Sequence, residues 1–557
     1  MGSLDKDGSR KGWVKARLSE IALINPSVSS ELTDDLEVSF IPMRAVEAIS
    51  GKVDLTESRT VGEVRSRYTS FRDGDVLWAK ITPCMENGKA AVMRGLKNGL
   101  GFGSTEFHVL RPRDPGVRGE WLFFFLIQRS VRRDAKNNMT GSAGQLRVPV
   151  AYLTEMCLPL PPLVEQRAIV AKIEALFSEL DKGVELLKTV KQQLKQYRQA
   201  VLKAAFEGKL TAEWRSKQQA AGRLPSADDV LEAIKMAREE RYRQQVLEWE
   251  QAVVAWELGG GEELGRKKPT KPQKLPPMVS GANGTSSALP AEWTEVTLGA
   301  VIETLTYGTA KKCVAEPHGT SVLRIPNIVA GRIDTTDLKY ATFSEDELET
   351  YALQADDVLI IRSNGSVSLV GRPALVTDHD THHLFAGYLV RLRPNRAIVS
   401  GRYLVWCLQA PRLRVQIEAK ARSTSGVHNI NSDEICSLRI PFCSLAEQQV
   451  VVAEIEARFS VLDNLDRAVD HGLQQAEALR QGILKKAFEG RLLSEAELAA
   501  VRNDPDYEPA DKLLERIRAE RERNVQPSRG RRTRTTAQPN SRRRSEKSAE
   551  ETVNSGR

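Results

Sequence analysis

The 557-residue sequence lacks the motifs that would mark an enzyme, a membrane protein or a secreted protein. It has no GxxxxGK[ST] phosphate loop, no Asn/Asp-Pro-Pro-Tyr/Phe tetrad for amino methylation and no PD…(D/E)xK nuclease pattern. It has no apolar run of about 18 residues, and its start is polar. We therefore expect a non-catalytic cytoplasmic protein that does not contact a membrane.

Metal and disulfide chemistry are equally poorly represented. The six cysteines form no CxxC pair, which argues against a disulfide framework or a structural zinc site. The run from Asp378 to His383 (DHDTHH) lies in a polar turn without a helical i, i+4 face, so we interpret it as a loop. The segment from Gly99 to Gly103 resembles a cofactor loop, but it runs into a strand instead of opening a helix. We expect no metal and no cofactor in this chain.

Net positive charge is scarce outside one terminal segment. The chain carries 81 Lys+Arg and 73 Asp+Glu, a net charge of +8, of which +6 lies in residues 524–557. We interpret that segment as a disordered basic tail because it has almost no large apolar residues. Residues 13–160 carry 20 basic and 17 acidic side chains, and residues 293–440 carry 16 of each. Overall charge alone therefore does not identify a nucleic-acid-binding domain.

What the sequence does contain is a long internal repeat. At an offset of 282, residues 165–210 match residues 447–492 at 22 of 46 positions, and weaker matches continue on both sides. The expected organisation is listed in chain order: 13–160 first variable domain, 161–214 central conserved helix, 215–258 charged helical extension, 259–290 linker, 293–442 second variable domain, 443–523 distal conserved helix and short charged helix, 524–557 tail.

Each conserved segment has apolar residues at heptad spacing, which is typical of coiled coils. A helix of 46 residues would span roughly 69 Å. We expect an α+β protein in which two globular domains are separated by two long helices that form an antiparallel coiled coil, with a pseudo-twofold internal repeat. The expected seam consists of Ile173, Leu180, Leu187, Leu194, Val201, Ile455, Leu462, Val469 and Ile483.

Two blocks carry a family resemblance. PLPPLVEQRAIVAKIEALFSELD with LKAAFEGKLTAEW, repeated as RIPFCSLAEQQVVVAEIEARFSVLD with LKKAFEGRLLSEA, resembles the conserved regions of type I restriction-modification specificity subunits. The variable blocks resemble the family's two target recognition domains. The segment 215–290 and the tail depart from the family pattern, so any partner contacts there stay open.

The resemblance implies a DNA-reading subunit without catalytic activity. Each target recognition domain would read one half of a bipartite, asymmetric site in double-stranded DNA, and the coiled coil would set the spacing and dock two methylation subunits. Restriction subunits would join the full complex. S-adenosylmethionine, ATP and Mg²⁺ would be bound by those partners and not by this chain.

Base reading requires polar or basic side chains on loops that reach a groove. The candidates in the first domain are Arg65, Arg67, Lys80, Thr82, Asn87, Lys89, Ser142, Gln145 and Arg147. Those in the second domain are Lys311, Lys312, Arg362, Ser363, Asn364, Ser366, Arg422, Ser423, His428, Asn429 and Asn431.

Two alternatives stay open. A fused methyltransferase fragment would bind S-adenosylmethionine itself, although its catalytic motifs are missing. A coiled-coil scaffold with no DNA role would need only the duplicated helices, whereas this chain also has a matched domain ahead of each.

Overall fold

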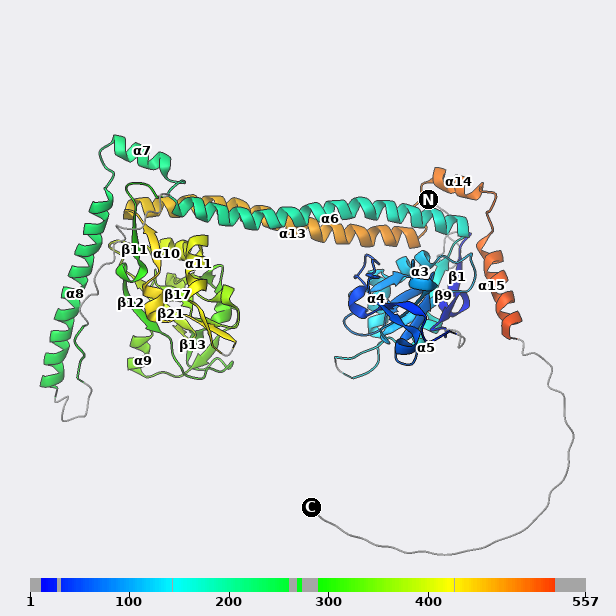
Figure 1. Ribbon diagram of the computed structural model, residues 1–557, viewed down its shortest axis with the longest axis horizontal. Coiled ribbons are helices and arrows are strands. Elements are labelled where there is room, and N and C mark those ends of the chain that lie inside the picture. Colours follow the sequence, from blue (N-terminus) through cyan, green and yellow to red (C-terminus); the bar gives the residue numbers. More distant parts are fainter. Residues whose placement is uncertain are drawn as a thin grey trace, which may run out of the picture. The chain divides into compact units, whose positions relative to one another are not determined.

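A computed structural model describes residues 12–27, 32–142, 144–259, 268–272, 289–424 and 426–525 (Figure 1). The segment 526–557, most of the expected tail, and most of the expected linker, 260–267 and 273–288, lie outside the described residues. The chain divides into two compact units, 1–182 with 476–557, and 183–475. No helix of the described residues is long and apolar enough to cross a membrane.

The first unit contains an α+β domain built on two four-stranded sheets. Five short helices, α1 to α5, pack beside the sheets, and strand β1 pairs antiparallel with β10. In sheet order the strands are β2 (Ala22–Ile24), β9 (Phe107–Pro112), β6 (Val76–Ala79), β7 (Ala90–Val92), then β4 (Ser58–Thr60), β3 (Glu37–Ile41), β8 (Leu100–Gly103), β5 (Thr69–Arg72). The remaining elements are β1 (Val14–Arg17), α1 (Leu18–Ile21), α2 (Val61–Val64), α3 (Gly119–Leu126), α4 (Arg129–Asn137), α5 (Val150–Glu155) and β10 (Cys157–Leu160).

The second unit contains a related domain with a six-stranded sheet and two three-stranded sheets. The six strands are β12 (Ile302–Tyr307), β21 (Leu389–Pro394), β17 (Val358–Ile361), β19 (Pro373–Leu375), β15 (Gly331–Ile333) and β14 (Ile328–Val329). The smaller sheets are β16 (Lys339–Ala341), β13 (Thr320–Leu323), β20 (Leu384–Phe385), and β18 (Ser363–Asn364), β23 (Val427–Asn429), β22 (Arg422–Thr424). The other elements are α9 (Glu345–Thr350), α10 (Gly401–Gln409), α11 (Pro411–Lys420), α12 (Ser432–Cys436) and the pair β11 (Thr294–Thr297) with β24 (Arg439–Phe442).

Two long helices follow the two domains. Helix α6 covers Leu163–Phe206 and α13 covers Leu445–Phe488, 44 residues each. Further helices come after them: α7 (Ala212–Ala220) and the 32-residue α8 (Ala227–Leu258) after α6, and α14 (Glu495–Arg502) and α15 (Ala510–Val525) after α13. Ser226 caps α8, since its hydroxyl accepts from the N–H of Asp229 and the Asp229 carboxylate accepts from the N–H of Ser226.

The two long helices run antiparallel in each unit. In the second unit Lys191 bonds Asp470, and Arg198 bonds Asp463 at 2.7 Å, so the partner number falls as the first rises. In the first unit Asp181 pairs with Arg480 in the same sense. The expected α+β class and the antiparallel coiled coil are confirmed.

A heptad seam has two sets of apolar positions, a and d, and only one of them is largely buried here. Ile173, Leu194, Val201, Ile455, Leu462, Val469 and Ile483 are buried, while Leu180 and Leu187 are half-buried. Leu187 faces Gly472, whose missing side chain leaves room for it. The second set is partly exposed to solvent, as the side chains of Leu176, Tyr197, Leu465 and Leu479 show.

The start of α13 has one half of a capping box. The Ser444 hydroxyl accepts from the N–H of Glu447 at 3.3 Å, as a cap does. The Glu447 carboxylate instead accepts from the Thr211 hydroxyl and from Arg215, each at 2.6 Å. The acid therefore ties the turn after α6 to the first turn of α13.

The repeat recurs in the contacts at the same 282-residue offset. The ion pair of Asp75 with Arg111, at 2.7 Å, has its counterpart in Asp357 with Arg393, at 2.8 Å, and both aspartates are buried. These pairs join β6 to β9 and β17 to β21. The two domains therefore share the same buried ion pair, although their sequences match only weakly.

A buried glutamine repeats in the same way. The Gln448 amide donates to the carbonyls of Ile398 and Cys443, at 2.9 and 3.0 Å, and accepts from the N–H of Ser400 at 3.2 Å. Gln166 makes the equivalent bonds to Gly116, Pro161 and Arg118 at 2.9, 2.9 and 3.0 Å. Each glutamine holds its long helix to the domain before it.

Candidate nucleic-acid interface

In the first domain, two of the predicted polar loops lie together. The N–H of Thr82 donates to the carbonyl of Leu146 at 3.0 Å, and the N–H of Val148 donates to the carbonyl of Lys80 at 2.9 Å. The segment 80–89 is therefore bonded to the base of the loop 140–148. Among the candidates, this cluster contains Lys80, Thr82, Asn87, Lys89, Ser142, Gln145 and Arg147.

The loop 140–148 is a closed hairpin. Thr140 and Arg147 exchange both backbone hydrogen bonds, at 2.9 and 2.8 Å. Gly141 and Gly144 have positive φ angles of 130° and 83°, which glycine adopts without the penalty of a side chain. Ser142 and Gln145 are exposed near the tip. The hairpin thus holds polar side chains out from the domain.

The second domain contains the same arrangement as a regular small sheet. Strand β18 pairs with β23, joining Ser363 to Asn429, and β22 pairs with β23, joining Arg422 to Asn429. Subtracting the repeat offset of 282 gives the bridges from Ile81 to Arg147 and from Thr140 to Arg147, and both exist in the first domain. The two candidate loops are therefore equivalent in pairing as well as in sequence position. Candidates brought together here are Arg362, Ser363, Asn364, Ser366, Arg422, Ser423, His428, Asn429 and Asn431.

Arg362 is held by an aromatic ring that sequence reasoning missed. Its guanidinium lies 4.6 Å from the ring centre of Tyr307, at the end of β12. The Tyr307 hydroxyl accepts from the N–H of Ser432 at 2.9 Å, which fixes the ring. A tyrosine at a strand end looks like ordinary core in the sequence, so no signal there distinguished it.

Some buried polar atoms at this small sheet have no hydrogen-bond partner in the described residues, as do others elsewhere in the chain. Arg362 Nε and Asn429 Oδ1 are buried and have no hydrogen-bond partner within the described part of the chain. Buried polar atoms are seldom left unpaired, because desolvation is costly.

Arg147 is engaged within its own domain. It forms a two-pronged ion pair with Glu106, with contacts of 2.7 and 2.9 Å, and this hydrogen bonding lowers the pKa of the Glu106 carboxyl. The guanidinium therefore braces the hairpin instead of projecting freely. Glu106 is a second residue that sequence reasoning missed.

The histidine behind the hairpin is uncharged. His108 is buried, one ring nitrogen lies 2.8 Å from the carbonyl of Val148, and the other lies 3.2 Å from the amide of Asn25. Burial lowers the pKa of His108 to about 4. The neutral ring supports the base of the hairpin at ordinary pH.

The remaining candidates do not join these clusters. Arg65 donates to the carbonyl of Leu32 and lies 3.7 Å from Asp34, next to α2, and Arg67 is exposed beside it. Lys311 pairs with Glu347 at 2.6 Å, and Lys312 is exposed. The hydrogen-bond and ion-pair partners of the Arg65 and Lys311 side chains within the described residues are Leu32, Asp34, Thr342 and Glu347, none of which lies in the paired loops.

Metal-binding groups do not gather in the described ranges, where no three His, Cys, Asp or Glu side chains could hold one ion. His383 instead bonds the Ser321 hydroxyl at 2.6 Å. What the geometry defines is a protein with two similar α+β domains, each presenting a paired polar loop, joined to antiparallel helices.

Comparison with known proteins finds similarity to one family. Residues 10–196 match the model of the type I restriction modification DNA specificity domain. The EcoEI specificity subunit of Escherichia coli is 29% identical over 82% of this chain and 79% of its own length. The EcoKI specificity subunit of Escherichia coli strain K12 is 24% identical over 92% and 96%.

A solved structure agrees on the fold. It comes from work on complex assembly and conformational transition of the type I restriction-modification system, has a TM-score of 0.60 and 20% identity, and covers 87% of this chain and 99% of its own. The chain is similar to the type I restriction-modification specificity subunits over most of its length and most of theirs. This likeness indicates the DNA specificity subunit of such a system.

Proposed function

We propose that each domain reads one half of a bipartite, asymmetric site in double-stranded DNA. The observation that carries this proposal is the equivalent pairing of the two loops, 80–89 with 140–148 and 362–366 with 422–431. Their sequences differ while their positions agree, as two readers of different bases require. Base edges supply the sequence information, and phosphate contacts supply most of the affinity.

The antiparallel helices set the spacing between the half-sites and dock two methylation subunits. Support comes from apolar side chains of α6 and α13 that are exposed to solvent within the second unit. Leu186 and Tyr197 share one face of α6 and are 65% and 53% exposed, and Val461 and Leu465 on α13 are 57% and 48% exposed. Large apolar side chains grouped in this way favour a protein partner.

Catalysis, cofactors and cleavage belong to the partners in this proposal. The methylation subunits bind S-adenosylmethionine, and restriction subunits with ATP and Mg²⁺ complete the assembly in the cytoplasm. The near-neutral domains of this chain imply weak binding to DNA without those partners. A tight, sequence-specific complex of the purified chain alone would contradict that part.

The direct test is a genome-wide map of methylated adenines, in cells carrying the methylation subunit with and without this chain. We expect a two-part motif with a fixed spacer only when the chain is present. Native mass measurement of the purified complex should give two methylation subunits for each chain. A motif with one uninterrupted block would overturn the two-reader proposal.

A further inference from the structure

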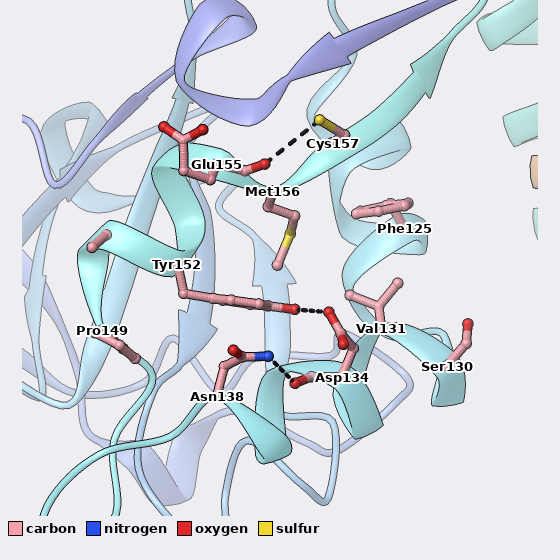
Figure 2. A pocket seen from close by; sticks show the side chains of 11 residues that line it. Phe125, Ser130, Val131, Asp134, Asn138, Pro149, Tyr152, Glu155, Met156 and Cys157 are labelled. Carbon is pink, nitrogen blue, oxygen red and sulfur yellow. Dashed lines mark hydrogen bonds between the residues drawn. The ribbon is translucent and has the colours of Figure 1, made fainter. Parts of the chain in front are cut away.

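A pocket of about 670 Å³ opens in the first domain between α4, α5 and the start of β10 (Figure 2). Phe125, Val131 and Met156 supply apolar walls. The Tyr152 hydroxyl donates to the Asp134 carboxylate at 2.6 Å and so links α5 to α4. Burial, together with this bond, raises the pKa of Tyr152 well above its ordinary value, so the phenol remains a donor.

The edge of a strand faces this pocket. Cys157 of β10 lies opposite Arg17 of β1. The neighbouring pair is hydrogen-bonded, since the N–H of Leu18 donates to the carbonyl of Met156 at 2.7 Å. Hydrogen-bonded and non-bonded pairs alternate along an antiparallel ladder. The N–H and C=O of Cys157 therefore point away from β1, and no side chain of the described residues bonds either group.

The second domain fills the equivalent place from its own chain. Gln416 stands at the repeat position of Asp134, and Arg439 at that of Cys157. The Gln416 amide donates to the carbonyl of Arg439 and accepts from its N–H, each at 2.9 Å. A carboxylate such as that of Asp134 accepts but cannot donate, so it cannot replace this amide.

We propose that this pocket is the docking site for an extended, positively charged polypeptide segment of a partner protein. An amide group of that segment takes the place that Gln416 fills in the second domain and pairs with the Cys157 peptide. This is strand addition at an open sheet edge, with side chains entering the adjoining pocket. The inference rests on the proposed partnership with methylation subunits, which makes that subunit the partner to test.

Charge favours a basic segment. The ionisable carboxylates that line the pocket are Asp134 and Glu155. Arg17 lies 3.4 Å from Glu155, whereas the side-chain partner of the Asp134 carboxylate is the neutral Tyr152 hydroxyl. A lysine or arginine beside the docked amide would meet Asp134 across an apolar-walled pocket.

The position of the pocket links assembly to DNA reading. Asn138 and Pro149 line it, and they stand at the two ends of the hairpin 140–148. Asn138 also donates to the carbonyl of Asp134 at 2.9 Å. A segment docked here therefore braces the base of the loop that reads the first half-site.

The test fills the partner's place in the pocket with a side chain of this protein. In full-length Asp134→Gln, the new amide should pair with the Cys157 peptide as Gln416 does with Arg439, and exclude the partner. We expect the affinity for the methylation subunit to fall at least 10-fold. The matched control Asp134→Glu keeps the charge and cannot donate, so its affinity should stay within 3-fold. Hydrogen exchange establishes that both variants are folded.

A second readout uses the exposed thiol of Cys157 at the rim. Alkylation by N-ethylmaleimide should slow at least 10-fold when the methylation subunit is added to the unaltered chain. Unchanged labelling in the assembled complex, or an Asp134→Gln chain that assembles normally, would overturn the inference. Failure of the unaltered chain to assemble would instead overturn the proposed partnership.

Discussion

Replacing Gln448 with leucine should detach the second domain from α13 without changing the shape of the buried site. The residue is fully buried, and its amide satisfies two carbonyls and one N–H. Leucine has a similar volume but no polar atom. The carbonyls of Ile398 and Cys443 and the N–H of Ser400 would then be buried without a partner.

The expected cost follows from those three groups. Each unsatisfied buried polar group costs about 1–3 kcal/mol. Slight opening of the site to water reduces the sum, so we expect a loss of about 3–5 kcal/mol in the free energy of unfolding. At about 2–4 °C per kcal/mol for a large domain, that corresponds to a fall in Tm of roughly 6–20 °C.

Hydrogen exchange resolved along the chain is the assay, because it separates the two units. Protection should fall in residues 293–475 and stay unchanged in 32–142. Gln474→Leu on the exposed side of α13 is the control, with an expected effect within about 0.5 kcal/mol. A loss below about 1 kcal/mol in Gln448→Leu, or equal loss in both units, would refute the argument.

Three further predictions concern stability and assembly. Because the unfolded chain takes up a proton near pH 6.5 that buried His108 takes up only near pH 4, the first domain should lose about 3 kcal/mol as the pH falls through that interval; His108→Gln should flatten this loss in acid melts. Leu187→Asp should destabilise the helix pair and reduce assembly with the methylation subunit, because a charge would face Gly472 in the seam; normal melting and assembly would contradict this. Glu106→Gln should loosen the hairpin that Arg147 braces, raising exchange in 140–148 without altering the second domain.

The architecture could be predicted from the sequence because the patterns that indicate it extend over many residues. A match over 46 residues and heptad spacing survive local irregularity, so the repeat and the antiparallel helices could be predicted. The exposure of the second set of seam positions was not predicted, since Tyr197 and Leu465 are apolar whether or not a partner covers them. Burial of a heptad position depends on the neighbouring chain, which periodicity does not describe.

The sequence was enough to locate the loops of the candidate interface. It was not enough to assign a role to each residue in them. The paired glycines, Gly144 and Gly426, and the polar runs around them located both loops. The brace between Arg147 and Glu106 and the stacking of Arg362 on Tyr307 join residues 41 and 55 positions apart. Such contacts depend on strand order, so sequence reasoning could not tell a bracing arginine from one that projects toward DNA.

The central claim, one reader for each half-site, is tested most directly by paired motif maps. Full-length chains carrying Arg362→Ala with Asn364→Ala, or Ser142→Ala with Gln145→Ala, would be expressed with the methylation subunit, and methylated adenines mapped across the genome. We predict that each variant relaxes one half of the motif, a different half in each case, while the spacer length stays constant. Equal loss at both halves in either variant would contradict the account.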